Sequence, residues 1–352
     1  MIVFLREMKE HMEAKIKSVR EKKRIYYLDI LRGLAVLFMV MQHSILMLEY
    51  TGGNNTGVIG TILIILGTAP AAPVFMFVMG VFIMKSKAGH WSFVRRGLKL
   101  LFAGYVLNFI RFSIPMLLDG NLEESIKMLF YVDIFQLAGV FFITAILFRK
   151  LANNLYFTPL FILAVLSISP YLWGLPPEMP ITNLLWGTGE TVSFPYFPWC
   201  VYPLLGMYLS KYVCHSYIEK RHRKIIVLSA IVLGTVGFFI LEMFPYLDYE
   251  RFGLGASMAM IAFVLIYMII IERTTNLLDL TPKNRIIGLV VSWSTNITNI
   301  YWVSWILFTI IALIIGFNGF NDMISGLIGI LVMIMTHLII KYTKINRIIP
   351  KI

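Results

Sequence analysis

The chain has 352 residues, of which 59% are hydrophobic and only 14% are charged, and its mean hydropathy is +0.79. A soluble domain carries about 25% charged residues, so this composition excludes a soluble globular protein. We attribute the formal net charge of +12 mostly to cytoplasmic segments near anionic lipid headgroups, and we expect no nucleic-acid partner.

Apolar runs of membrane-spanning length recur along the chain from Ile30 onward. Transmembrane helices need about 17–25 apolar residues, whereas strands of a membrane barrel alternate with a period of two. The runs in this chain are continuously apolar, so we expect an all-α, polytopic membrane bundle. The ten expected spans lie near residues 30–48, 58–84, 98–118, 131–148, 155–173, 196–213, 224–243, 253–271, 297–316 and 323–341.

Lysine and arginine are concentrated in alternate loops between these spans. The positive-inside rule then predicts that both termini are cytoplasmic. The opposite loops are mainly acidic, and Arg111, Lys127 and Arg251 are the basic residues assigned to them. The expected organisation is a basic cytoplasmic tail at 1–27, a transmembrane domain at 28–343 and a short basic cytoplasmic tail at 344–352.

The first span carries two ionisable side chains within its apolar run, Arg32 and His43. Their separation of eleven residues turns an α-helix by three turns plus about 20°, with a rise of about 16 Å. Both side chains therefore share one face at different depths. Each has a simpler interpretation alone, since Arg32 could extend to the headgroups and His43 could bond a neighbouring helix. Ionisable groups at membrane depth usually face a protein interior or a cavity, so together they favour a site.

Two other stretches stand out from the apolar pattern. The ninth span is preceded by polar residues between Ser292 and Thr298, which form either the lining of an aqueous cavity or an interfacial amphipathic helix. Residues 174–195 form the longest loop after the first tail and contain several prolines. We expect an ordered surface or re-entrant loop there, on the non-cytoplasmic side.

Several sequence blocks resemble a known superfamily. Residues 24–43, which contain Asp29-x-x-Arg32-Gly33, resemble the opening of transmembrane acyltransferases. The spacing of Arg32 and His43 is similar to that of the acyltransferase-3 branch. Blocks at residues 73–80, 95–100, 132–136 and 194–206 resemble the heparan-α-glucosaminide N-acetyltransferase-like branch, so the branch is left open.

The resemblance implies transfer of an acyl group, expected to be acetyl, from cytosolic acetyl-CoA to a saccharide or lipid-linked acceptor across the membrane. Bound phosphates need fixed cations, and Arg32, Arg95, Arg96 and Lys99 are available on the cytoplasmic side. Asp29 precedes Arg32 by three residues and is expected to pair with it. No metal-ligand spacing is visible, so no metal is expected, and a homodimer is left open.

His43 is the candidate for the transfer step, because histidine accepts and returns protons near neutral pH. It could act as a general base or carry the acyl group as a nucleophile. Asp133, at the start of the fourth span, is expected at the level of His43 and could orient it, or could only cap its helix. A different class of function also remains open, a secondary transporter that uses Arg32 and His43 as a substrate and proton relay.

Overall fold

The computed structural model describes residues 24–49 and 57–343, except 153, 155, 174, 176–178, 188, 214, 245–251 and 317–318. The two expected tails lie outside the described residues, apart from 24–27. Helix α2 already begins at Tyr26, two residues before the expected start of the transmembrane domain.

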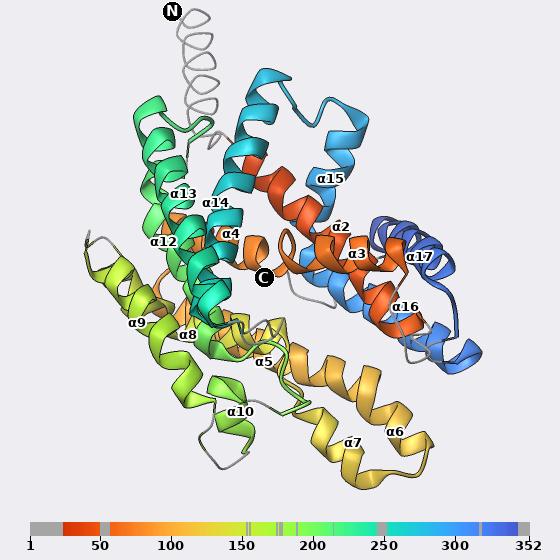
Figure 1. Ribbon diagram of the computed structural model, residues 1–352. Helices are drawn as coiled ribbons and strands as arrows, with labels where there is room; N and C mark the ends of the chain where they lie inside the picture. The colour runs from red at the N-terminus through yellow and green to blue at the C-terminus, as the bar shows by residue number, and fades with distance from the viewer. Residues whose placement is uncertain are drawn as a thin grey trace, which may run out of the picture.

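The described residues form helices, and their β-type pairings are two isolated bridges, Glu49 with Phe320 and Val132 with Val192. The helices (Figure 1) are α2 Tyr26–Leu48, α3 Val58–Thr68, α4 Ala72–Lys85, α5 His90–Asn108, the π-helical turn η1 Phe109–Ser113, α6 Ile114–Leu118, α7 Leu122–Leu129, α8 Ile134–Leu151, α9 Phe157–Leu172, α10 Pro180–Trp186, α11 Tyr196–Trp199, α12 Val201–Val213, α13 Lys220–Met243, α14 Leu254–Leu277, α15 Arg285–Thr295, α16 Ile297–Ile315 and α17 Asp322–Tyr342.

Eight helical segments in the described part of the chain are long and apolar enough to cross a membrane. Each coincides with an expected span, and the segment at Val58–Lys85 combines α3 and α4. The other two expected spans correspond to shorter helices, α9 with 16 residues and α12 with 13. The chain is therefore a multi-pass integral membrane protein, and among the described residues eight of the ten expected spans correspond to helices that meet the length requirement.

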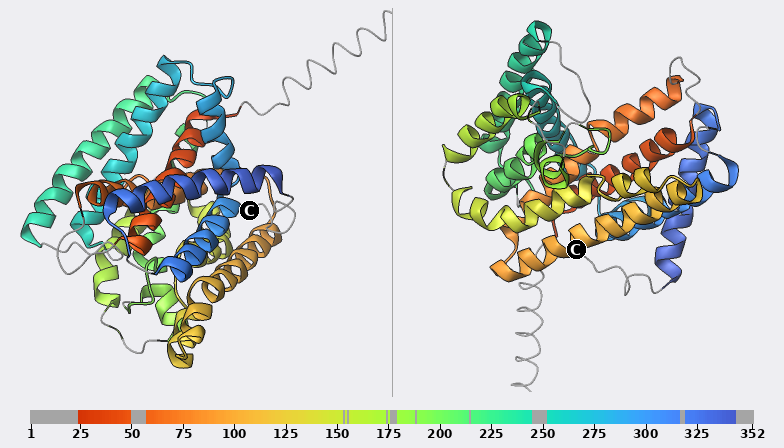
Figure 2. Two further views of the ribbon diagram at one scale, coloured as in Figure 1. Left: turned by 90° about the vertical axis from the view of Figure 1, so that its right-hand side faces the viewer. Right: turned by 90° about the horizontal axis from the view of Figure 1, so that it is seen from below.

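Helix α2 lies at the centre of the part of the bundle that holds the site (Figures 1 and 2). It packs against α3, α4, α14, α15, α16 and α17. Gly33 brings α15 very close, because a Cβ atom at this position would lie 2.2 Å from the carbonyl oxygen of Val290. The same packing places α15 beside the face of α2 that carries Arg32.

The far edge of the bundle is formed by α13, which lies alongside α14 (Figures 1 and 2). Only Ile226, Ala230 and Gly237 of α13 are buried. The rest of this helix exposes large apolar side chains, which is the expected surface of a helix that faces lipid. Helix α13 therefore contributes hydrophobic surface at this edge, whereas α14 contacts both α13 and α2.

The third expected span contains the π-helical turn η1, and Arg111 lies in the middle of it. The assignment of Arg111 to a non-cytoplasmic loop is wrong, because its side chain is only 1% exposed within the bundle. The apolar helical segment extends on both sides of Arg111, from His90 to Leu118, so the arginine lies within a membrane-spanning segment and its side chain is buried in the bundle. π-Turns are rare and often occur at functional sites.

Candidate functional site

Three neighbouring cavities follow the face of α2 that carries Arg32 and His43. The first, here the Arg32 cavity, has a volume of about 160 Å³ and is lined by Arg32 and Arg96. The second, here the neck, has about 40 Å³ and is lined by His43 and Tyr301. The third, here the Arg111 cavity, has about 580 Å³ and is lined by His43 and Arg111. The Arg32 cavity and the neck share Phe75, Phe135 and Ile297, and the neck and the Arg111 cavity share Gln42, His43 and Phe194.

The prediction that Arg32 and His43 share one helix face is confirmed by this lining. Between them, Ala35, Val36 and Met39 of the same helix line the neck. One face of α2 therefore borders all three cavities in sequence. His43 lies where the neck meets the Arg111 cavity, and Arg32 lies at the opposite end of the series.

A polar cluster at the junction of α2 and α15 holds Arg32 in place. Arg32 Nε donates a hydrogen bond of 2.9 Å to Ser294 Oγ, and Ser294 Oγ donates one of 3.0 Å to Asp29 Oδ1. Asp29 also pairs with Arg24 at 2.6 Å and with Arg32 Nη2 at 3.5 Å, so the expected pair of Asp29 and Arg32 is present. The cluster fixes one edge of the guanidinium and leaves the group in the lining of the Arg32 cavity.

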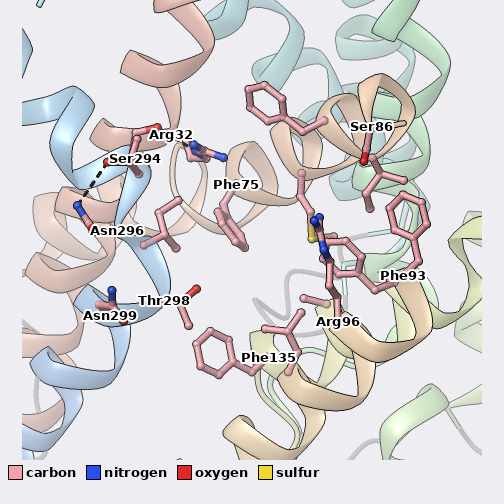
Figure 3. Close-up of a pocket in the computed structure, with 18 residues that line it drawn as sticks. Arg32, Phe75, Ser86, Phe93, Arg96, Phe135, Ser294, Asn296, Thr298 and Asn299 are labelled. Carbon is pink, nitrogen blue, oxygen red and sulfur yellow. Dashed lines mark hydrogen bonds between the residues drawn. The ribbon is translucent and has the colours of Figure 1, made fainter. Parts of the chain in front are cut away.

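Arg96 of α5 lines the Arg32 cavity from another side. In Figure 3, Phe75 lies between Arg32 and Arg96. Arg95 and Lys99, the other predicted donor-binding cations, are exposed and do not belong to this lining. They are four residues apart and so share a helix face, whereas Arg96 is turned away from Arg95 by about 100°. The structure thus brings together two of the four predicted cations.

The polar stretch before the ninth span forms a further wall of the Arg32 cavity. All residues from Ser294 to Asn299 line it, at the point where the chain passes from α15 to α16 (Figure 3). The break occurs at Asn296, which ends one helix and precedes the other. The cavity-lining interpretation of this stretch is confirmed. Because residues Ile297–Asn299 of this lining begin α16, the N-terminal end of that helix, with its positive partial charge, borders the cavity.

Two aromatic rings of α16 hold His43. Its ring centre lies 4.3 Å from that of Trp305 and 5.7 Å from that of Tyr301. His43 Nδ1 is buried and has no hydrogen-bond partner among the described residues. The side chain as a whole is partly exposed and lines two cavities. Ring packing, rather than a hydrogen bond in the described part of the chain, therefore sets the orientation of the imidazole.

Asp133 lines the same cavity as His43 but bonds other groups. Its Oδ1 accepts from the backbone N–H of Ile134, and its own N–H donates to Gln136 Oε1, so the expected cap of α8 is present. Its Oδ2 accepts hydrogen bonds of 2.5 Å from both Arg111 and Tyr301. Among the described residues, no hydrogen bond joins Asp133 to His43. The carboxylate instead accepts a hydrogen bond from the hydroxyl of Tyr301, and the ring of Tyr301 packs against the histidine.

Arg111 is a site residue that the sequence analysis missed. Its guanidinium pairs with Asp133 at 2.5 Å and donates to Asn108 Oδ1 at 3.1 Å. The guanidinium carbon also lies 4.4 Å from the centre of the Trp305 ring and 4.3 Å from that of Phe112. A buried charge is tolerated only with such compensation. The signal that could have revealed it is a single arginine within the apolar run at 98–118.

The end of the 174–195 loop closes the Arg111 cavity. Val132 N–H donates to the carbonyl of Thr191 at 2.8 Å, and Ser193 N–H donates to the carbonyl of Val132 at 3.0 Å. The hydroxyl groups of Tyr131 and Ser193 also share a hydrogen bond. This pairing fastens the loop beside the start of α8, where Phe194 lines both the neck and the Arg111 cavity. The described end of the loop is therefore ordered, as expected.

Residues 24–244 match the family described as heparan-alpha-glucosaminide N-acetyltransferase, catalytic. The chain belongs to this family. A comparison with curated proteins found no match. The match decides between the two branches that the sequence blocks left open. It covers Arg32, His43, Arg111 and Asp133, whereas α15 and α16 lie beyond it.

In this member of a membrane acetyltransferase family, the linings of the Arg32 cavity and the Arg111 cavity suit different ligands. The Arg32 cavity combines two guanidinium groups with the N-terminal end of α16, which suits an anionic ligand. The Arg111 cavity combines aromatic rings with hydroxyl and amide groups, which suits a polar ring. The described residues contain no group of His, Cys, Asp or Glu that could hold a metal ion.

Proposed function

We propose that this protein transfers an acetyl group from acetyl-CoA in the Arg32 cavity to a saccharide or lipid-linked acceptor in the Arg111 cavity. The observation that carries the proposal is the position of His43, whose imidazole lines the neck between the two cavities. Membership of an N-acetyltransferase family supports the type of reaction. The positive-inside pattern of the sequence supports a cytoplasmic Arg32 cavity, so transfer would proceed across the membrane.

Acetyl-CoA carries several phosphate groups, and Arg32 and Arg96 are the two cations in the lining of the Arg32 cavity. Charge-assisted hydrogen bonds from guanidinium groups are the strongest contacts that a protein offers to phosphate. Asp29 and Ser294 hold the guanidinium of Arg32 in a fixed direction, which limits the entropy lost when the donor binds. Asp29 is therefore a positioning residue for the donor site.

In the proposed transfer step, His43 removes a proton from the acceptor amine or hydroxyl as that group attacks the thioester carbonyl carbon. The carbon–sulfur bond then breaks, and the imidazolium returns the proton to the leaving thiolate of CoA. In the alternative route, the imidazole attacks the thioester carbonyl and the carbon–sulfur bond breaks, so that CoA leaves; the acceptor then attacks the acetyl-imidazole, loses its proton and releases the imidazole. The second route predicts ping-pong kinetics, which distinguishes it from direct transfer. We assign Asp133 a positioning role, because it holds Tyr301 against His43.

The lining of the Arg111 cavity supports a saccharide acceptor. Phe112 contributes aromatic surface to this lining, and Gln42, Thr68 and Ser193 contribute polar groups for the hydroxyls of a sugar. Leu46 also belongs to this lining and is 58% exposed. That exposed apolar rim favours a saccharide attached to a lipid over a freely soluble one.

The test is transfer of labelled acetyl groups by the purified full-length protein in detergent, with methyl α-glucosaminide as the acceptor probe. We expect labelled product with the wild-type protein and a rate about 10²–10⁴-fold lower with His43→Gln. Solute uptake by proteoliposomes without any dependence on acetyl-CoA, together with no transfer, would contradict the proposal and favour a transporter.

A further inference from the structure

Leu46 is the one exposed side chain of helix α2, whose other residues from Tyr26 to Leu48 are buried or half-buried. Because α2 packs against six other helices, this exposure marks a place where its neighbours leave it uncovered. Leu46 lies about one helical turn after His43, and both residues line the Arg111 cavity. The cavity that contains His43 is therefore open on the side of Leu46.

The rim of this opening is apolar and comes from three membrane-spanning segments. Leu46 of α2, Ile64 of α3 and Phe112 of η1 line the cavity, and each of them is exposed or half-buried. Helix α3 packs against α2, α4 and α17, whereas η1 packs against α5, α6, α7 and α16, so these two walls are held by different neighbours. Each of the three segments is long and apolar enough to cross a membrane. An apolar opening at this level faces lipid rather than water.

The polar groups of the same cavity lie deeper than its rim. Gln42 is 5% exposed and Ser193 is 9% exposed, against 58% for Leu46. Gln42 also lines the neck together with His43, so the polar part of the lining is the part nearest the histidine. The lining therefore changes from polar near His43 to apolar at the opening. An amphiphile with a polar headgroup and a hydrocarbon chain has the same order of polarity.

Helix α7, which packs against η1, indicates the depth of the opening in the membrane (Figure 1). Its exposed side chains Leu122 and Ile126, and Phe130 directly after it, recur every four residues and form one apolar stripe. Ser113 and Ser125 fasten α7 to η1, because each hydroxyl donates a hydrogen bond to the other residue's carbonyl. A helix with an exposed apolar stripe beside charged residues is typical of the membrane interface. The opening at η1 therefore lies near the headgroup region of the bilayer.

Resting on the proposed function, we propose that the acceptor is a glycolipid that enters the Arg111 cavity sideways from the membrane. Its sugar headgroup reaches His43, and its hydrocarbon chain leaves past Leu46, between α3 and η1, into the lipid. The rim residues Leu46 and Ile64 are thus specificity-determining residues for the acceptor, and they take no part in the chemical step.

The test compares methyl and octyl α-glucosaminide as acceptors for the full-length protein in lipid nanodiscs, which leave both faces accessible. Each methylene that moves from water to apolar surface contributes a factor of about four, so the wild-type octyl-to-methyl ratio of kcat/KM should exceed about 10. Leu46→Trp should lower this ratio by at least about 10-fold, because a hydrocarbon chain that no longer fits is penalised by about that factor for one methylene. Ile64→Trp, from the wall formed by α3, should lower the ratio in the same way.

Leu228→Trp is the matched control, because Leu228 is 63% exposed on α13 and lines none of the three cavities. It should leave the ratio at its wild-type value, including the part that comes from partition of the octyl chain into the nanodisc lipid. The ratio does not depend on how much of each variant is folded. A wild-type ratio near one, or an unchanged ratio in Leu46→Trp, would overturn the inference while leaving the proposed transferase intact. Absence of transfer to either acceptor by the wild-type protein would instead contradict the proposed function itself.

Discussion

His43 is held by ring packing against Trp305 and Tyr301, so its side chain can be exchanged with limited effect on the fold. We expect His43→Gln to lower the transfer rate by about 10²–10⁴-fold, because glutamine neither titrates nor carries an acyl group. Binding of acetyl-CoA, measured by calorimetry, should persist. A His43→Gln protein that transfers acetyl groups near the wild-type rate would remove the imidazole from the mechanism.

Arg32 should contribute to donor affinity through the shape of its guanidinium as well as its charge. We expect Arg32→Ala to weaken acetyl-CoA binding by about 10–100-fold, since a hydrogen bond to a charged group contributes about 1.5–3 kcal/mol. Arg32→Lys should restore little, because an ammonium lacks the planar fork. Arg95→Ala is the control, since Arg95 is an arginine outside the cavity lining. Equal affinity of Arg32→Ala and wild type for acetyl-CoA would exclude this role.

The ion pair of Arg111 and Asp133 is buried, with side chains 1% and 9% exposed. Asp133→Asn keeps the helix cap but leaves the Arg111 charge without a carboxylate, which should destabilise the protein by about 3–5 kcal/mol. The double variant Arg111→Met with Asp133→Asn should recover much of the melting temperature, because no unpaired charge remains. Its transfer rate should stay low, since Tyr301 has then lost its carboxylate partner. Recovery of both stability and rate would show that the pair does not position the site.

At the scale of elements, the contact of α2 with α15 decides whether Arg32 meets Ser294. A Cβ atom on Gly33 would lie 2.2 Å from the backbone oxygen of Val290, which cannot move without the helix. Gly33→Ala should therefore lower both the melting temperature and the affinity for acetyl-CoA. The control is Gly89→Ala, because a Cβ atom on Gly89 meets no atom within 4 Å. Wild-type affinity in Gly33→Ala would contradict the link between this contact and the donor site.

The elements also explain what the sequence could and could not predict. Hydropathy predicted where the helices lie, because each apolar run is local in the sequence. Helical periodicity placed Arg32 and His43 on one face, because both residues belong to the single helix α2. Arg111 was counted with the non-cytoplasmic loops by the positive-inside rule, although it lies within the expected span 98–118, and its partner Asp133 is 22 residues away, so no local pattern indicated that its charge is paired inside the bundle. The partners of Asp133 depend on Tyr301, 168 residues away, and no local pattern contains that contact.

At the scale of the whole molecule, the match to the family ends at residue 244, before α15 and α16 begin. Those two helices nevertheless supply Ser294 to the lining of the Arg32 cavity and the two rings that hold His43. The site is therefore complete only when the segment beyond the matched region packs onto α2. The neck and the Arg111 cavity that result border His43 from two sides along one helix, which is the arrangement that the proposed transfer across a membrane needs.

The direction of transfer depends on which side of the membrane the Arg32 cavity faces. Its lining includes Ser86 and Arg96 from the basic segment 85–99, which the positive-inside rule places in the cytoplasm together with the basic start of α13. A cysteine engineered at Lys220 should therefore resist a membrane-impermeant thiol reagent added to intact cells and react after permeabilisation. A cysteine at Glu123, an exposed residue in a segment expected on the other side, should react in intact cells. Labelling at Lys220 with protection at Glu123 would reverse the orientation and place the donor cavity away from cytosolic acetyl-CoA.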